Sequence, residues 1–321
     1  MAPKTLLEAV KRFGNYEACK DFMVAMRWPD GKIACPRCGS EHVTFLAKAR
    51  VWKCYARHPQ PTFTLKTGTI FEDSPIALEK WLPVVWLLVN CKNGISSYEV
   101  HRGIGVTQKS AWFMLQRVRL ALQNGSLMKL GGGGTAVEVD ETFIGGKARF
   151  MHKSRRIRVL GSDATAHFMG KIAVQGLLER HGELRVRVVG NAKNANLQQG
   201  VREHVAPGAT VYSDEATAYD KLNADGYQHQ VIRHAEKHVD GKVHTNGIEH
   251  FWSLLKRGLG GTYISVEPFH LFRYVDEQAF RYNNRKDLND SDRFEIAMSQ
   301  IVGKRLTFAE VTGNGCQTAI N

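Results

Sequence analysis

The sequence predicts an α/β protein whose main domain is a mixed sheet flanked by helices, preceded by a small cysteine ribbon and a helical region. Three observations support this prediction. Cysteine pairs lie near the start of the chain, a helical apolar rhythm fills residues 73–130, and the pattern changes to strands after the glycine run at 131–134. Strands that come first and then alternate with helices are typical of a mixed sheet with helices on both faces.

Length and charge limit the classes of protein to consider. The chain has 321 residues, 43% of them hydrophobic, which is enough for two or three domains with real cores. Its 44 Lys and Arg against 31 Asp and Glu give a net charge of +13. This excess favours a polyanionic partner, DNA before a membrane, because neutralising phosphates releases counterions. The first twelve residues lack the apolar core of a signal peptide, and the longest apolar run, 81–89, is about half of a membrane span. We therefore expect a cytoplasmic, nucleoid-associated protein with no membrane partner.

Two pairs of potential metal ligands follow a predicted helix pair at 4–27. Cys35 and Cys38 form a Cys-x2-Cys unit on a glycine-bearing turn, and Cys54 and His58 follow some fifteen residues later. This spacing predicts a tetrahedral structural zinc site. The alternative is a ribbon that packs without metal, around Trp52, Phe63 and Ile70. The remaining cysteines have no partner at ligand spacing and are expected to be buried or incidental thiols: Cys19, Cys91 and Cys316.

The next stretch has the pattern of a helix-turn-helix. Ser74 as N-cap and Pro75 at the first helical position predict a helix over 75–91. Two more helices, 95–104 and 108–122, flank a glycine turn, and Thr107 is placed to cap the second. Early residues of a recognition helix reach base edges and later basic ones suit phosphates. The DNA-binding candidates on this helix are thus Gln108, Lys109 and Ser110, followed by Gln116, Arg117 and Arg119. An ordinary helical hairpin is the alternative.

Beyond a predicted flexible linker at 131–134, strands and helices alternate. The predicted strands are 136–144, 169–178, 183–189, 210–213 and 229–232, and the predicted helices are 194–205, 215–222, 245–257, 267–285 and 293–302. Residues 147–158 carry six Lys or Arg and no acid, and are predicted to be a basic loop. This loop could follow phosphates through Lys147, Arg155 and Arg156, or could simply be solvated.

Three acidic residues are candidates for one site. Asp140 lies inside an apolar strand, where a carboxylate is costly without compensation, and Asp214 ends a later strand. If the two strands pair in parallel, both carboxylates face one crevice. Glu249 opens a helix on a polar stripe with Asn246, Ser253 and Lys256, away from the apolar stripe that contains Trp252. Hard oxygen ligands select Mg²⁺ or Mn²⁺, and two such ions support in-line displacement at a phosphodiester. The alternative is that Asp214 is a turn residue and Glu249 a helix-start carboxylate.

At these residues the sequence resembles the bacterial insertion-sequence transposases of the ISXO-like group, which place a zinc ribbon ahead of a DDE catalytic domain. The matching stretches lie in the family's order between residues 35 and 285: CPRCG, TGTIFEDSPIALEKWL, NCKNGISSYEVHRGIGVTQKSAWFMLQR, VEVDETFIGGK, VYSDEATAY, HTNGIEHFWSLLKRG and GTYISVEPFHLFRYVDEQAFRYNNR. The resemblance implies an RNase H-like fold, divalent metal, and cut-and-join chemistry at transposon ends.

Carried over by motif, Asp140, Asp214 and Glu249 would be the catalytic metal ligands. Lys256 would contact the DNA backbone near the scissile phosphate, with Arg257 beside it. Two departures from the family pattern are visible. First, the Cys54-x3-His58 unit replaces a second Cys pair. Second, some relatives use Asn or His as the third ligand, and here Asn246 and His250 flank Glu249.

The expected function is therefore a DDE transposase that binds terminal inverted repeats, hydrolyses the end phosphodiester on two Mg²⁺ or Mn²⁺ ions and joins the 3′-hydroxyl to target DNA. Holding two ends together requires at least a homodimer. The alternatives are a domesticated transposase that only regulates by binding DNA, and a Mg-dependent nuclease without strand transfer. Trp252 is expected in the core rather than stacked on a displaced base. The predicted ranges are 1–72 for the helix pair and ribbon, 73–130 for the helix-turn-helix, 131–134 for the linker, 135–305 for the catalytic domain and 306–321 for a C-terminal tail.

Overall fold

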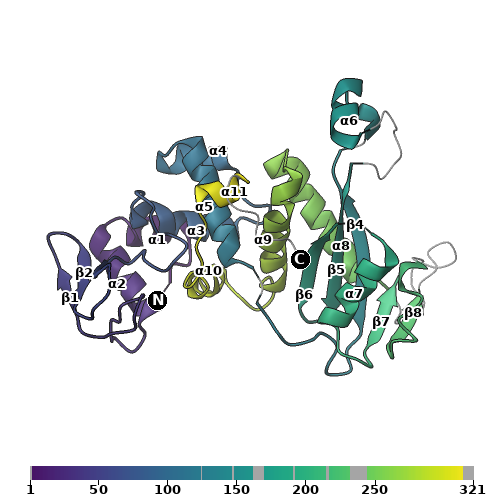
Figure 1. Ribbon diagram of the computed structural model, residues 1–321, viewed down its shortest axis with the longest axis horizontal. Coiled ribbons are helices and arrows are strands. Elements are labelled where there is room, and N and C mark those ends of the chain that lie inside the picture. The colour runs from purple at the N-terminus through teal and green to yellow at the C-terminus, as the bar shows by residue number, and fades with distance from the viewer. Residues whose placement is uncertain are drawn as a thin grey trace. The chain divides into compact units, whose positions relative to one another are not determined.

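The computed structural model describes the chain except for residues 1, 124, 147, 162–169, 191, 215–216, 232–243 and 314–321. The chain divides into two compact units (Figure 1). Unit 1 combines Met1–Gln123 with Asn284–Asn321, and unit 2 is Asn124–Asn283. Among the helices that the structure describes, none is both long enough and apolar enough to cross a membrane.

Unit 1 begins with two short helices and a three-stranded ribbon. Helices α1 (Leu6–Arg12) and α2 (Tyr16–Arg27) start at side-chain caps, where Thr5 and Asn15 accept backbone N–H bonds. The antiparallel strands β1 (Val43–Leu46), β2 (Val51–Cys54) and β3 (Thr62–Phe63) follow in that order. The ring of Trp52 packs between Phe45 and Phe63, with centroids 4.6 and 5.9 Å away, so the ribbon has a small aromatic core.

The helical part of unit 1 contains the two helices and the glycine turn expected from the sequence. Helix α4 (Ser97–Ile104) ends at Gly105 with φ 61°, and Thr107 accepts from the Ser110 N–H at the start of α5 (Gln108–Ala121). The preceding helix, α3, differs from its prediction because it spans Leu78–Asn90 and has Ala77 as its N-cap. The Ser74 hydroxyl, expected to cap it, instead accepts a 3.1 Å bond from the Trp81 indole N–H.

The end of the chain belongs to unit 1. Helix α10 (Asp290–Ser299) opens with a capping box and packs on α3, where Asn90 donates to the Asp290 carbonyl and accepts from Arg293 at 2.9 Å. A last short helix, α11 (Phe308–Val311), packs on α5. The predicted catalytic range of 135–305 therefore differs from the compact unit, which ends at Asn283. The apolar rhythm of a helix shows which face is buried, not which body buries it.

Unit 2 is built on a five-stranded mixed sheet of order β6-β5-β4-β7-β8 (Figure 1). Its strands are β4 (Val137–Ile144), β5 (Ile172–Glu179), β6 (Leu184–Val189), β7 (Thr210–Ser213) and β8 (Gln228–Val231). Strands β4, β7 and β8 are parallel neighbours, while β5 and β6 pair antiparallel. The predicted strands and the parallel pairing of the two strands that bear Asp140 and Asp214 are thus confirmed.

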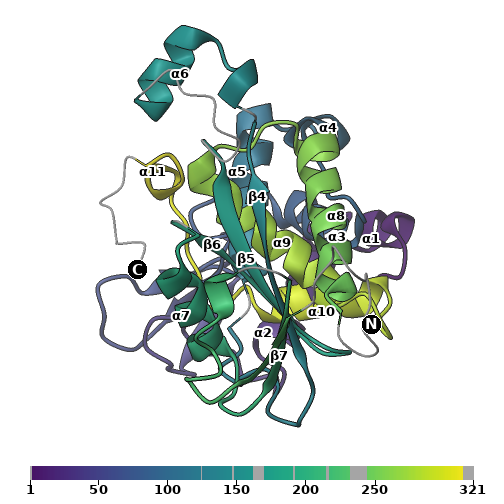
Figure 2. The same cartoon turned by 90° about the vertical axis from the view of Figure 1, so that its right-hand side faces the viewer.

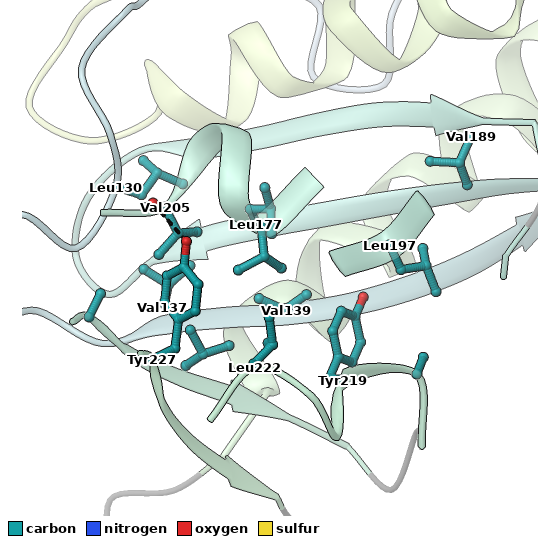
Figure 3. Close-up of a cluster of buried hydrophobic side chains, with 14 of the residues drawn as sticks. Leu130, Val137, Val139, Leu177, Val189, Leu197, Val205, Tyr219, Leu222 and Tyr227 are labelled. Carbon is teal, nitrogen blue, oxygen red and sulfur yellow. Dashed lines mark hydrogen bonds between the residues drawn. The ribbon is translucent and has the colours of Figure 1, made fainter. Parts of the chain in front are cut away.

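Both faces of this sheet are covered by helices (Figure 2). On one face, Val137 and Val139 of β4 pack with Leu197 of α7 (Asn194–His204) and with Tyr219 (Figure 3). On the other face lie α8 (Asn246–Arg257) and α9 (Leu271–Asn283). The even-numbered residues of β4 face α8, so the alternation of the strand directs Asp140 to that side.

Three segments of unit 2 differ from what the sequence predicted. Gly131 is not part of a free linker, because it is buried and donates its N–H to Glu179 at 2.9 Å. The expected basic loop contains a 3-10 turn at Ala148–Phe150 and helix α6 (Lys153–Leu160), which lies beyond the end of β4 and away from the sheet (Figures 1 and 2). The expected helix 215–222 is a 3-10 turn, Thr217–Tyr219, within the described residues.

Candidate active site and metal centre

The four predicted zinc ligands of unit 1 lie together. The ligand atoms of Cys35, Cys38, Cys54 and His58 are all within 4.8 Å of one another. Cys35 Sγ is 3.7 Å from His58 Nε2, and Cys38 Sγ is 3.7 Å from Cys54 Sγ. Three thiolates and one imidazole are a usual tetrahedral set, so this Cys3His cluster supports a structural Zn²⁺ ion. The aromatic core around Trp52 also forms, so the ribbon has both the ligand cluster and the packing that the sequence offered.

In unit 2, the acidic residues face one cavity. Asp140 lies on β4 and Asp214 directly follows β7, whose last residue, Ser213, pairs with Val139. The cavity measures about 550 Å³. It is lined by Asp140, Glu141, Thr142, Asp214, Asn246, Glu249, Trp252, Ser253 and Lys256. Among the described residues, the Cys3His cluster of unit 1 is the group of potential ligands close enough to share one ion, and the three carboxylates do not form such a group.

Asp140 is held by a side chain of α8. The Trp252 indole N–H donates a 2.8 Å hydrogen bond to Asp140 Oδ2. This approach requires Gly176, the residue opposite Asp140 on β5, because a Cβ there would lie 2.9 Å from the Trp252 ring and 2.7 Å from Ile248. Trp252 is 5% exposed, as expected for a core residue, and its contact with Asp140 is one that helical spacing alone could not reveal.

One residue that lines the cavity, Glu141, bears a carboxyl group that sequence reasoning missed. Glu141 lies on the opposite face of β4 and accepts a hydrogen bond from the Tyr219 hydroxyl, which in turn accepts a 3.1 Å bond from Gln175. Burial raises the pKa of Glu141 to about 7. Burial, followed by the charge of Asp214, likewise raises the pKa of Asp140 to about 7, although the Trp252 bond lowers it. The only sequence signal was the acidic pair itself.

The start of α8 is fixed by a buried ion pair. The Glu138 carboxylate is 2% exposed, accepts the Ile248 N–H at 3.0 Å and lies 3.3 Å from Arg180 Nε. Arg180 also donates to the His244 carbonyl, and its guanidinium lies 4.5 Å from the ring centroid of Tyr212 on β7. The Glu138–Arg180 ion pair thus connects the segments that bear Asp140, Asp214 and Glu249.

The polar stripe of α8 faces the cavity as predicted. Its apolar residues Ile248, Phe251, Trp252 and Leu255 are buried. Glu249 is exposed and accepts a 2.9 Å bond from the Thr245 hydroxyl. Asn246 and Lys256 line the cavity one turn before and two turns after Glu249, while the exposed Arg257 is not among the lining residues.

The predicted DNA-binding residues divide into accessible and buried ones. Lys109 is exposed and lies over the Phe308 ring, Gln108 donates to Ser97, and Ser110 contacts Thr107.

Arg117 is a correction. It is 5% exposed and donates to the carbonyls of Leu306 and Ile70, so it holds segments of unit 1 together and cannot reach phosphates. Gln116 and Arg119 are buried as well. On α6, Arg156 donates to the Met151 carbonyl, whereas Lys147 and the Arg155 side chain lie outside the described residues.

Two family models match the chain in the same order as its structure. A transposase zinc-ribbon domain matches residues 14–57, and an ISXO2-like transposase domain matches residues 129–283. The chain is also 29% identical, over 257 residues, to a protein of Halobacterium salinarum described as an uncharacterized protein in transposable element ISH50. That match covers 78% of this chain and 85% of the relative. An uncharacterized transposase-like protein of Haemophilus influenzae is 33% identical over 97 residues, which are 30% of this chain and 78% of the relative.

Proposed function

Since the chain belongs to the insertion-sequence transposases that combine a zinc ribbon with an ISXO2-like transposase domain, we propose that it cuts and joins DNA at the ends of its element. In this proposal water attacks the end phosphodiester and the 3′-oxygen leaves. The freed 3′-hydroxyl then attacks a phosphodiester of target DNA and displaces its 3′-oxygen. The observation that carries the proposal is the cavity in which Asp140, Asp214 and Glu249 meet from three separate segments.

The donor set suits Mg²⁺ or Mn²⁺. All three proposed ligands offer carboxylate oxygens, and the raised pKa of Asp140 means that the buried negative charge lacks a compensating cation in the protein alone. Asp140, Asp214 and Glu249 would hold the ions, with Asn246 as the alternative third ligand. Two ions at such a site supply activation of the attacking oxygen and stabilisation of the leaving one.

The other residues of the cavity would orient the reacting groups. Trp252 fixes the direction of the Asp140 carboxylate, and Thr245 does the same for Glu249. Lys256, at the cavity edge, would hold a phosphate beside the scissile one, with Arg257 next along the backbone.

Recognition of the terminal inverted repeats would fall to unit 1. The zinc ribbon and the first turn of α5, with Gln108, Lys109 and Ser110, would contact the ends. Arg156, together with Lys147 and Arg155, would follow phosphates of donor or target DNA. Joining requires two ends at once, so we expect at least a homodimer, acting on the nucleoid in the cytoplasm.

The test replaces one carboxylate at a time. Asp140→Asn or Asp214→Asn should lower end cleavage by about a thousandfold or more, since the metal ions supply several kcal/mol of charge stabilisation. Binding to the ends should stay within about twofold, because these residues lie outside the proposed recognition helix. Asp225→Asn, an equal change at an exposed position of unit 2, is the control. Normal cutting by either cavity variant would refute the assignment.

Two other functions use parts of the same machinery. A domesticated transposase that only regulates would bind the ends and never cut them with Mg²⁺. A nuclease would cut but would not join pre-cut ends to target DNA. Incubating the protein with the element's own ends and Mg²⁺, followed by analysis of cut and joined products, separates all three.

A further inference from the structure

The turn that follows α8 displays an apolar side chain beside the carboxylate cavity. A π-helix, Gly258–Tyr263, continues α8, and Ile264 then has φ 61° and ψ −55°. The Ser265 N–H donates to the Tyr263 carbonyl at 2.6 Å, which closes a γ-turn centred on Ile264. This positive-φ form of the γ-turn is rare and strained, most of all for a β-branched residue. Ile264 is nevertheless 82% exposed, so burial of its own side chain does not offset the strain.

The turn is held in this conformation by the residue before it. The Tyr263 hydroxyl donates to the carboxylate of Glu277, which is fully buried on α9 and also binds Arg281. The Tyr263 ring packs edge-on against Tyr274, with centroids 4.7 Å apart. The exposed Ile264 therefore stands on a rigid support. Strained backbone and π-helical turns that the surroundings enforce are common at functional sites.

A groove lies beneath this side chain. It measures about 450 Å³ and opens next to Lys256, which also lines the carboxylate cavity. Its lining is mostly apolar or glycine: Phe143, Ile144, Gly145, Gly146, Leu259, Gly260, Ile264, Ser265 and Val266. At Gly146 and Gly260, no atom of the described residues beyond the adjoining backbone and chain neighbours lies within 4 Å of where a Cβ would be, so the space around these two glycines is open.

A nucleobase fits this surface better than a phosphate does. Apolar side chains stack on bases and wedge between base pairs, while extruded bases are held in pockets with apolar walls. Lys256 offers a cation for the phosphate of the same nucleotide. Trp252 is not available for stacking, because it is buried and bonded to Asp140.

We propose that this groove receives a base unstacked from the DNA end next to the scissile phosphate, and that Ile264 takes the place of that base in the stack. The proposal rests on the proposed DNA-cutting function of the adjoining cavity. Removing the terminal base from the stack would free the backbone to bend towards Asp140 and Asp214.

The experiment uses Ile264→Gly, because glycine adopts positive φ without strain and the variant should melt no lower than the wild type. The probe is a duplex of the element's terminal inverted repeat with 2-aminopurine at each base pair around the cleavage position in turn. The binding assay uses the full-length Asp140→Asn variant, so that the DNA is not cut. Binding should raise the fluorescence at one position about threefold or more, and adding Ile264→Gly should remove most of that rise while the Kd stays within about twofold. Leu127→Ala, which truncates a 96% exposed side chain in the same unit outside the groove, should have no effect.

Cleavage gives the second readout. With Asp140 restored, Ile264→Gly should cut fully paired ends about tenfold more slowly, and a mismatch at the unstacked position should restore the rate. If the wild type cuts normally but no position brightens, or if Ile264→Gly unstacks and cuts like the wild type, the base groove is wrong while the proposed function stands. Normal cutting by Asp140→Asn would instead overturn the proposed function.

Discussion

Two neighbouring carboxyl groups make the stability of unit 2 depend on pH. Burial raises the pKa of Asp140 and of Glu141 to about 7 from ordinary values of 3.8 and 4.5. Between those values, the folded protein keeps protons that the unfolded chain has already released. The contribution of these groups to the free energy of unfolding is therefore greatest at low pH, and it is lost as the pH rises to about 7.

We predict that Asp140→Asn stabilises the protein at alkaline pH in the absence of Mg²⁺. The amide removes a buried charge, so at pH 8 the variant should exceed the wild type by about 3 kcal/mol, and the difference should vanish near pH 4. Denaturant unfolding over this pH range, with zinc retained, measures it. Adding Mg²⁺ at pH 8 should stabilise the wild type and leave the variant unchanged. A difference that is the same at every pH would contradict the argument.

At the scale of single elements, the sequence predicted what depends on local spacing. The alternation of β4 and the apolar stripe of α8 were both confirmed, because the side-chain period is a property of the element itself. The start of α3 and the exposure of Arg117 were not predicted correctly. Arg117 depends on a partner distant in sequence, because it donates to the carbonyl of Leu306. Ser74 is engaged by Trp81 of α3 itself, and a capping residue type does not show which donor its hydroxyl will meet.

The same limit applies to the contacts that position the carboxylate cavity. The sequence pattern did not single out Glu138 among the polar residues of its strand. Its carboxylate nevertheless binds both the first turn of α8 and Arg180. Gly247 permits this contact, because a Cβ there would lie 2.8 Å from Glu138 Oε2. An acid inside a strand indicates a compensating partner, but the sequence does not say which one.

We predict that Glu138→Gln loosens α8 from the sheet. Glutamine still accepts the Ile248 N–H but leaves Arg180 without its counter-charge, so unit 2 should lose about 3 kcal/mol. Because α8 carries Glu249, the Mg²⁺ concentration for half-maximal cleavage should rise as well. Glu203→Gln is the matched control, since its ion pair with Arg187 is exposed and worth about 1 kcal/mol or less. Equal losses in both variants would show that Glu138 has no special positioning role.

For the molecule as a whole, the two units have separate cores. Among the described residues, the two buried clusters on the faces of the sheet, which include residues of α7, α8 and α9, consist of residues of unit 2. The Cys3His cluster belongs to unit 1, together with helices α4 and α5. Sequence patterns predicted both kinds of domain but placed 284–305 with the sheet, because a weakly amphipathic helix does not indicate which core it joins.

Zinc removal should therefore affect one unit only. Metal analysis should find about one zinc per chain. Either a zinc-selective chelator or Cys38→Ser should make residues 28–66 sensitive to protease. The reason is that small metal ribbons gain much of their folding free energy from the ion. Specific binding to the ends should weaken about tenfold or more as the ribbon loses its shape. The calorimetric transition of unit 2 should stay where it was, because its core contains none of the ligands. Cys91→Ser, a cysteine outside the cluster, should change neither property. A ribbon that resists protease and contains no zinc would mean that the packing of Trp52, Phe63 and Ile70 alone holds it together.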